Sequence, residues 1–359
     1  MNDTAQLDQT AEMHGSNQHL AQQSAAPLVS IIIPCHNQAR FLSDAIASVQ
    51  GQTHSPVELI VVDDGSPDNT AEIARRYEAI RYLRQENRSV PTARNAGFSA
   101  STGAYVMFLD ADDRLTPNAV QEHLRCFADH PEAGFVVGDI DQIHEDGSYK
   151  DSPRWPILRS NFYGELLKVN HVANTIAVMF RRSVLEQLGG FDTSGDGGED
   201  YELLLRSARS FPSAHHSTVV AQYRRYPSSR SQQGVRMLRA MRRIMRSQRT
   251  FVRGNAALEA ACRKGEAYWR YHYGVTTIKE IIAHLCRGDL LRATKAFSGL
   301  LWYVRGRLLL VPWKERRRIW KFLQGILGSG RYREVSVPAA EHSSPFLPYS
   351  DSQRREQDG

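Results

Sequence analysis

The sequence predicts an α/β fold in which a doubly wound, mostly parallel sheet is flanked by helices and followed by a helical, basic extension. Three observations favour this fold. Apolar, β-branched segments typical of strands buried on both faces alternate with helical segments through the first 110 residues. The connections between them are short. Arginines then crowd the chain from residue 224 onward, in a stretch that is mostly of helical pattern.

Four strands are predicted in order along the first part of the chain: LVSIII (28–33), VELIVVDD (57–64), the short IRYLRQ (80–85) and AYVMFLD (104–110). The carboxyl ends of parallel strands meet at one edge of a sheet, and ligands gather there. Polar sequences follow three of these ends, namely PCHN, DDGS and DADD. That coincidence predicts a binding site at this edge.

The helices between the strands have recognisable ends. In QARFLSDAIASVQG the apolar residues share one face, and Gly51 is placed to end the helix. Ser66 and Pro67 are placed to cap and begin a helix that runs to about Tyr77. A third helix, in VPTARNAGFSASTG, is expected to close at Gly103. Further strands are predicted at GFVVGDI and NTIAVMF, and a further helix at SVLEQLGG.

The chain divides into four predicted regions: a disordered tail at 1–26, an α/β domain at 27–230, a helical basic region at 231–330 and a second disordered tail at 331–359. The first tail lacks the apolar core of a secretory signal, and no window of 18 uncharged apolar residues suits a spanning helix. The four cysteines lie far apart and fit neither a zinc site nor a disulfide framework. These features predict a cytoplasmic protein.

The stretch DADD places Asp110, Asp112 and Asp113 within four positions at the end of a buried strand. Mutual repulsion and desolvation both oppose such crowding. Carboxylate oxygens are the ligands that Mg²⁺ and Mn²⁺ prefer, so the stretch has the pattern of a divalent metal site. The alternative is a solvated turn whose aspartates cap the next helix, and this alternative stays open for Asp113.

The segments VSIIIPCHNQAR, VELIVVDDGSPDNT, ARNAG, YVMFLDADD, GGFD and GGEDYELLLR follow one another in the first two-thirds of the chain. In these segments, and over roughly residues 28–226, the chain resembles the family 2 glycosyltransferases of the GT-A fold. The resemblance implies an inverting enzyme that depends on Mn²⁺ or Mg²⁺ and uses a nucleotide-diphosphate sugar.

The resemblance also implies a role for each matching residue. The nucleotide-sugar-binding residues would be Pro34, His36, Asn37, Asp64, Arg94, Asp110, Ala111 and Asp112. Among them, Asp64 would bind the base and Arg94 would lie near the diphosphate. Asp110 would hold the ribose, and Asp112 would bind the metal.

The acidic segment GGED supplies the candidate catalytic residue. By the resemblance, Asp200 would be the general base, with Glu199 beside it, and the glycines before them let a loop reach the sugar. The alternative is that Asp200 is the N-cap of the helix YELLLRSAR, and the two roles are compatible. Many relatives place a histidine where Tyr226 stands, so no histidine ligand is expected here. Arg224 and Arg225 are candidate contacts for the diphosphate or the acceptor, with a solvated surface as the alternative.

Two basic segments dominate the last third of the chain. Segment 236–253 has seven arginines, no acid and an apolar stripe of helical period, and segment 292–326 has nine lysines and arginines interleaved with aromatic residues. This pattern resembles a helix at a membrane interface, and packing against the α/β domain is the alternative. No nucleic-acid recognition motif accompanies the charge, so nucleic acid is not an expected partner.

The resemblance implies an enzyme that moves one sugar, from UDP or dTDP, to a hydroxyl of a glycan or glycolipid acceptor in cell-surface polysaccharide or lipopolysaccharide synthesis. A lipid-linked acceptor at the inner face of the cytoplasmic membrane is a hypothesis that would explain the basic C-terminal pattern. The QxxRW signature of processive members is absent, which favours single addition. A sugar nucleotidyltransferase is one alternative, although the glycine-rich phosphate loop that it needs is missing. A non-catalytic nucleotide-sugar-binding module is the other.

Overall fold

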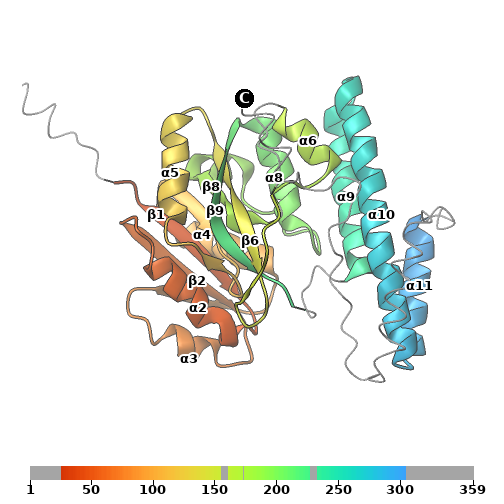
Figure 1. Cartoon of the computed structure of the whole chain (residues 1–359), viewed down its shortest axis with the longest axis horizontal. Helices are drawn as coiled ribbons and strands as arrows, with labels where there is room; N and C mark the ends of the chain where they lie inside the picture. The colour runs from red at the N-terminus through yellow and green to blue at the C-terminus, as the bar shows by residue number, and fades with distance from the viewer. Residues whose placement is uncertain (1–25, 155–160, 173, 227–232, 305–359) are drawn as a thin grey trace, which may run out of the picture.

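The computed structural model of the protein describes residues 26–154, 161–172, 174–226 and 233–304. Within these residues the strands form one nine-stranded sheet in the order β3-β2-β1-β4-β8-β6-β9-β5, with β7 paired to β6. Helices lie against this sheet, and three further helices stand together beside it (Figure 1). The two predicted tails, apart from Ala26, lie outside the described residues.

The strands have the following bounds: β1 Val29–Cys35, β2 Val57–Asp64, β3 Arg81–Gln85, β4 Tyr105–Phe108, β5 Arg114–Leu115, β6 Phe135–Ile143, β7 Tyr149–Asp151, β8 Val178–Arg181 and β9 Ser213–Arg224. The helices are α2 Ala39–Gln50, α3 Thr70–Ala74, α4 Val90–Ala100, α5 Ala119–Asp129, α6 Phe162–Lys168, α7 Arg182–Leu188, α8 Glu199–Ser210, α9 Gly234–Val252, α10 Ala256–Cys286 and α11 Leu290–Val304, with one 3₁₀ turn at Thr175–Ala177.

The first half of the sheet is parallel, as predicted. Strand β1 pairs in parallel with both β2 and β4, and β2 pairs in parallel with β3. Every residue of β1 is buried, in agreement with its unbroken apolar sequence. The carboxyl ends of β1, β2 and β4 therefore lie at one edge of the sheet. The predicted α/β fold is confirmed.

The second half of the sheet contains both parallel and antiparallel strand pairs. Strand β8 is antiparallel to both β4 and β6, while β6 and β9 are parallel to each other. The short β5 pairs with β9 in antiparallel register, with Arg114 opposite Gln222. Because β5 directly follows the acidic DADD turn, this pairing brings the end of β9 to that turn.

Three predicted helix ends are wrong. Helix α3 is capped at Asn69 rather than at Ser66 and ends at Ala74, short of Tyr77. The Ser66 hydroxyl instead accepts the backbone N–H of Asn37, 3.1 Å away. Helix α4 ends at Ala100, three residues before Gly103.

The apolar stripe predicted in 236–253 faces the protein interior. Its members are all buried: Met237, Met241, Ile244, Met245, Gln248 and Val252. The Gln248 carbonyl accepts the hydroxyl of Tyr163, 3.0 Å away on α6, which ties α9 to the α/β domain. Figure 1 shows α9 and α10 running side by side with α11 next to them. This stripe is therefore used for internal packing. Across the described ranges, the helices fall short of the length and apolar character that crossing a membrane requires.

Candidate active site

The ends of β1 and β2 meet through two side chains that follow them. The His36 imidazole donates from Nδ1 to the backbone oxygen of Asp64, 2.8 Å away. Its Nε2 is then the acceptor for the Asn87 amide, 3.2 Å away. The carboxylate of Asp64 is buried and accepts from Gln85 at 2.7 Å and from the backbone N–H of Arg88 at 2.9 Å. His36 is thus fixed at the edge of the sheet while its ring stays exposed.

Three other predicted donor-side residues occupy different positions. Pro34 is buried inside β1, opposite Val62 of β2. Asn37 is exposed and adopts a left-handed backbone conformation with a φ of 55°. Ala111 is buried within the acidic turn. Only Asn37 of these three therefore presents its side chain to solvent at the predicted site.

The acidic turn after β4 brings three carboxylates together. Oxygen atoms of Asp110, Asp112 and Asp113 all lie within 4.8 Å of one another. Burial, and then the charge of Asp110, raise the pKa of Asp112 above its ordinary value. Burial and both neighbouring acids raise the pKa of Asp113 well above its ordinary value. Burial and the closeness of the carboxylates therefore both oppose the charged forms of Asp112 and Asp113.

The end of β9 holds this turn in place through Arg224. Its backbone N–H donates to the Asp113 carboxylate at 2.7 Å, and its Nε donates to the backbone oxygen of Asp112 at 2.7 Å. The guanidinium also bonds the backbone oxygen of Glu145 and the carboxylate of Asp44. Of the roles left open for Asp113, the helix cap is wrong, because the cap position of α5 is Asn118 and Asp113 bonds Arg224 instead. Arg224 is buried and its guanidinium is engaged by protein groups.

Tyr226 extends this contact to the predicted metal ligand. Its hydroxyl donates to Oδ2 of Asp112 at 2.6 Å and accepts from the Gln38 amide at 2.8 Å. Tyr226, which stands where many relatives have a histidine, thus forms a direct hydrogen bond with Asp112. The neighbouring Arg225 turns elsewhere, because its guanidinium lies over the ring of Tyr223, 5.6 Å from the ring centroid.

Arg94 connects the acidic turn to the candidate base. This side chain, 2% exposed, donates to Asp110 at 2.7 Å through Nη2 and to Asp200 through Nη1. Asn174 donates to the second oxygen of Asp110 at 3.2 Å, and Thr175 donates to Asp200 at 3.4 Å. The carboxylates flank one guanidinium although they are far apart in the chain. Sequence reasoning missed Asn174 and Thr175, since nothing in NTIAVMF distinguishes them from an ordinary strand start.

Helix α4 places Arg94 by packing closely on the sheet. Gly97 lies so near β1 that a Cβ there would come within 2.3 Å of Ile32. The glycine of ARNAG is therefore required by close approach. One residue beyond Arg94, Asn95 forms two hydrogen bonds with the backbone of Phe191, at 2.9 and 2.8 Å. The same helix thus holds both the guanidinium and the GGFD turn.

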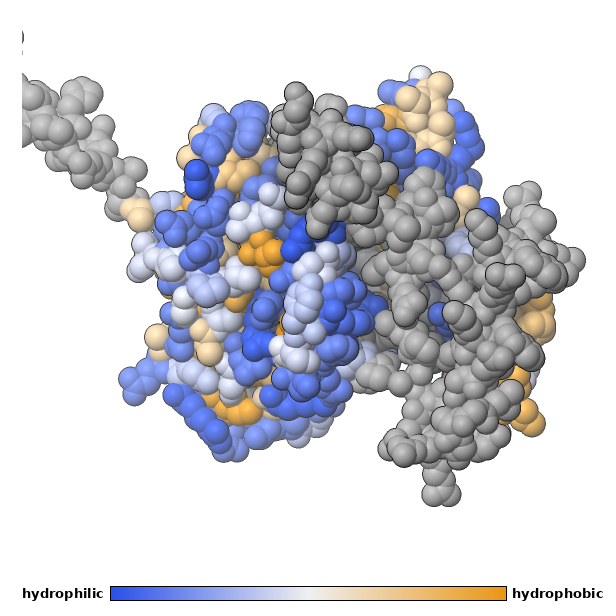
Figure 2. Space-filling view, viewed as in Figure 1, coloured by the Kyte–Doolittle hydropathy of each residue, from blue (hydrophilic) through white to orange (hydrophobic). Residues whose placement is uncertain are grey.

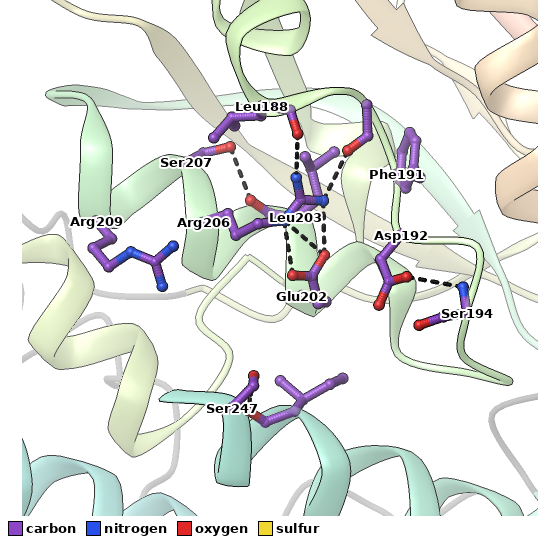
Figure 3. A network of polar contacts seen from close by, with 12 residues as sticks. Leu188, Phe191, Asp192, Ser194, Glu202, Leu203, Arg206, Ser207, Arg209 and Ser247 are labelled. Atoms are coloured by element: carbon purple, nitrogen blue, oxygen red, sulfur yellow. Dashed lines mark hydrogen bonds and ion pairs between the residues drawn. The ribbon is translucent and has the colours of Figure 1, made fainter. Parts of the chain in front are cut away.

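The loop before Asp200 is bent by glycines and anchored by Arg206. Gly197 and Gly198 have φ values of 101° and 73°, which side chains rarely adopt. Figure 3 shows Arg206 of α8 between Glu202 and the turn after α7. It donates to the backbone oxygens of Leu188 at 2.7 Å and Gly190 at 2.8 Å, and it pairs with Glu202. These bonds fix where α8 begins, and so where Asp200 lies.

The side chain of Asp200 is partly buried. It is 26% exposed, so it is open to solvent on one side. Burial raises the pKa of Asp200 to about 7, opposed by Arg94 and aided by the charges of Glu199 and Asp110. The alternative that Asp200 caps α8 is wrong, because the cap position belongs to Gly198. Asp200 lies in the first turn of this helix, where it bonds Arg94. Glu199 lies beside it, as predicted.

The acidic turn fits a divalent cation. Three carboxylates offer hard oxygen donors in one small volume, the chemistry that Mg²⁺ and Mn²⁺ prefer. Within the described residues, Oδ2 of Asp113 is buried and lacks a hydrogen-bond partner. A cation here would offset the repulsion that, after burial, raises the pKa values of Asp112 and Asp113.

Comparison with known proteins places this arrangement in a family. The model of glycosyl transferase family 2 matches residues 30–189, which include the strand ends, the acidic turn and Arg94. This segment belongs to glycosyl transferase family 2. The whole chain is 30% identical over 229 residues to the O-antigen biosynthesis protein RfbC of Myxococcus xanthus, covering 62% of this chain and 18% of that protein. It is 36% identical over 176 residues to an uncharacterized glycosyltransferase of Nostoc sp., covering 46% and 54%. The matched part therefore spans about half or less of these two relatives.

Solved structures confirm the GT-A fold of this protein. Residues 1–349 of S. aureus TarS superpose with a TM-score of 0.55 at 15% identity, covering 85% of this chain and 93% of that one. The same TarS segment has been solved with UDP and with UDP-GlcNAc. The mannosyltransferase PcManGT of Pyrobaculum calidifontis, in complex with GDP-Man and Mn²⁺, superposes with a TM-score of 0.52 at 16% identity, covering 90% and 89%.

Proposed function

We propose that this protein is an inverting, metal-dependent glycosyltransferase. It moves a single sugar from a nucleotide-diphosphate sugar to a hydroxyl of a glycan or glycolipid acceptor. The observation that carries the proposal is the bridge through Arg94, which joins Asp110 on the donor side to Asp200 on the candidate base side. The bridge sets the base candidate at a fixed place relative to the residues that would hold the donor.

The reaction follows from this placement. His36 and Asp64 would border the base, Asp110 would hold the ribose and Asp200 would face the sugar. Asp200 takes the proton of the acceptor hydroxyl as its oxygen forms a bond to the anomeric carbon. The bond from that carbon to the diphosphate breaks, and the nucleoside diphosphate leaves with the electron pair. Such a base contributes about 10²–10⁴-fold in rate.

Asp112 is the residue proposed to hold the divalent cation, with Asp110 and Asp113 beside it. When bound, the cation neutralises charge on the leaving diphosphate. Tyr226 and Gln38 orient the Asp112 carboxylate through the hydrogen bonds described above. Arg224 fixes the backbone of the turn, so we assign it a positioning role. Glu199 and Arg225 remain candidate acceptor contacts.

The donor is proposed to carry UDP or dTDP, and the acceptor to belong to cell-surface polysaccharide or lipopolysaccharide. The complexes of TarS with UDP and UDP-GlcNAc and the name of RfbC support these choices. The family assignment disfavours a sugar nucleotidyltransferase. A non-catalytic binding module would bind nucleotide sugar without transferring it, and this binding would not change when Asp200 is replaced. Single addition is proposed from the missing QxxRW signature.

Donor binding tests the metal assignment. Calorimetric titration of wild-type protein with UDP, dTDP and GDP should show binding that depends on Mn²⁺. In Asp112→Asn, the Mn²⁺-dependent affinity is expected to fall about tenfold or more, because a charged metal ligand is lost. Asp146→Asn, an exposed acid in the hairpin turn before β7, should match the wild type. Equal Mn²⁺-dependent affinities in Asp112→Asn and wild type would refute the assignment.

The pH dependence of transfer tests the state of Asp200. A base must be deprotonated to act, and the raised pKa leaves Asp200 protonated below about 7. The kcat/KM value should therefore rise with pH through about 7. Glu199→Gln removes a charge that raises this pKa, so the rise should move to lower pH. An unshifted acid limb in Glu199→Gln would show that another group controls it.

Membrane association is proposed for the last described helix. On α11 the apolar residues Leu290, Leu291 and Phe297 are 66%, 82% and 50% exposed, beside the basic Arg292 and Lys295. Figure 2 shows hydrophobic residues along the edge of the molecule where Figure 1 draws α11. Exposed apolar residues flanked by positive charge suit the surface of an anionic bilayer at the cytoplasmic face.

Flotation with anionic phosphatidylglycerol vesicles measures this association. Changing Leu290, Leu291 and Phe297 to serine should greatly reduce the floating fraction, because about 1.5–3 kcal/mol is associated with burying each large apolar side chain. A control with Tyr149→Ser and Phe251→Ser removes two other exposed aromatics, 63% and 53% exposed, and should float as the wild type does. Flotation that survives both the triple change and deletion of 292–330 would rule the proposal out.

A further inference from the structure

A pocket of about 220 Å³ lies between α9 and α10, apart from the site at the strand ends. From α9 it receives side chains three or four positions apart, which share one face of that helix. From α10 it receives residues of a single turn, Glu266, Trp269 and Arg270. None of these side chains has a role in the transfer chemistry proposed above.

The pocket is strongly basic. Its arginines are Arg242, Arg246 and Arg249 of α9 and Arg270 of α10, and its acid is Glu266. The Glu266 carboxylate accepts two hydrogen bonds from Arg249, of 2.6 and 2.7 Å. Among the lining residues that the structure describes, Arg246 and Arg270 then add positive charge in excess of this one acid. Guanidinium groups bind phosphate oxygens through paired N–H donors, so the excess favours a phosphate-type anion.

The floor of the pocket is apolar. Met241, Met245 and Trp269 line it and are all buried, at 3%, 1% and 9% exposure. Because apolar and aromatic surface lies next to the guanidinium groups, the pocket suits a ligand that carries an apolar group beside its phosphate. A free inorganic anion would leave this floor unused.

The same floor supports the candidate base. Met241 packs so tightly against Gly198 that a Cβ on that glycine would come within 2.4 Å of the methionine methyl group. Trp269 lies edge-on to Tyr201, with ring centroids 5.3 Å apart, and the Tyr201 hydroxyl lies 3.8 Å from the Met245 sulfur. Gly198 and Tyr201 flank Glu199 and Asp200 in the sequence. A ligand in the pocket therefore lies directly behind the first turn of α8.

We propose that the α9–α10 pocket binds a phosphate group of the acceptor together with the apolar group attached to it. The proposal rests on the proposed transferase function, since it assigns a chemical class to the acceptor of that reaction. Anchoring by the phosphate keeps the acceptor beside the α8 turn that carries Asp200.

Calorimetric titration of the full-length protein with octyl phosphate tests the pocket. Saturable binding is expected, tighter than that of inorganic phosphate or of the neutral octyl glucoside, and weaker as sodium chloride is added. The double variant Arg246→Gln, Arg270→Gln should weaken it by about tenfold or more, because charge-assisted hydrogen bonds are lost. Glutamine is a good helix former, so both helices should persist, which circular dichroism would verify.

The matched control is Arg239→Gln, Arg253→Gln, which removes the same charge from exposed positions outside the pocket. It should leave octyl phosphate binding near the wild-type value. Equal weakening in both double variants would overturn the pocket, and inorganic phosphate binding as tightly as octyl phosphate would overturn the acceptor assignment. UDP binding with Mn²⁺ should be the same in the pocket variant and wild type. If the wild type did not bind UDP with Mn²⁺, that result would count against the transferase function alone. Octyl phosphate binding is measured separately and would still test the pocket.

Discussion

Replacing Asp200 with asparagine is expected to lower kcat by about 10²–10⁴-fold while donor binding persists. The amide keeps the size of the side chain but cannot take the proton of the acceptor hydroxyl. Arg94 would still bond Asp110, so the donor side of the site should keep its shape. The measurement is sugar transfer at saturating donor, paired with calorimetric titration of UDP and Mn²⁺.

The control for this variant is Asp196→Asn in the same loop. The Asp196 side chain is 73% exposed and pairs with Arg236, away from Arg94. Its change should leave both kcat and UDP binding near the wild-type values. Transfer by Asp200→Asn at the wild-type rate would show that the base lies elsewhere. Loss of UDP binding in that variant would show that Asp200 shapes the donor site.

Replacing Arg94 with methionine is expected to be the most damaging single change to the fold. The side chain is 2% exposed, and its removal leaves Asp110 and Asp200 without their shared partner. Breaking a buried ion pair from one side costs about 3–5 kcal/mol in the free energy of unfolding. Transfer should be lost as well, because the two carboxylates are no longer held together. Urea denaturation measures the first effect.

Arg76→Met provides the comparison for Arg94. It breaks the exposed pair with Glu72, whose side chains are 63% and 65% exposed, and should change the free energy of unfolding by less than about 1 kcal/mol. The further variant Arg94→Met, Asp200→Asn removes one of the unpaired charges. It should recover part of the lost stability but none of the transfer. Equal stability of Arg94→Met and Arg76→Met would contradict the buried bridge.

Much of the fold could be predicted because its signals are local. The strands β1 and β2 appear as continuous apolar segments, and the bounds 57–64 predicted for the second are those observed. Strand–helix alternation then limits the topology to a parallel arrangement. The ends of α3 and α4 could not be predicted in the same way. Ser66 has a residue type suited to capping, but tertiary contact with Asn37 uses its hydroxyl instead.

In the candidate site too, some features could be predicted from local sequence and others depend on tertiary contacts. The order of the acidic motifs places Asp64, Asp110 and Asp112 at strand ends, because parallel strands share an edge. The predicted place of Arg94 beside the diphosphate remains a prediction, whereas its bonds to two carboxylates are visible only in the structure. The contact of Tyr226 with Asp112 is of the same kind, since 114 residues separate the partners.

The basic C-terminal region shows where sequence pattern is ambiguous. A stripe of methionines with arginines on the other face suits either a membrane surface or a protein core. In α9 the stripe is buried, whereas in α11 apolar side chains remain exposed. The amphipathic pattern of a sequence shows that a helix has an apolar face, but it does not show which protein or lipid surface covers that face.

By itself, the sequence determined the α/β architecture, the family and the edge of the sheet where acidic residues gather. Those properties follow from residue patterns within single segments and from the order of the motifs. The tertiary structure alone decided that one buried arginine joins the acidic turn to the base candidate, and that α9 and α10 enclose a basic pocket behind it. Both features depend on side chains from distant segments, whose meeting is set by packing of the whole chain.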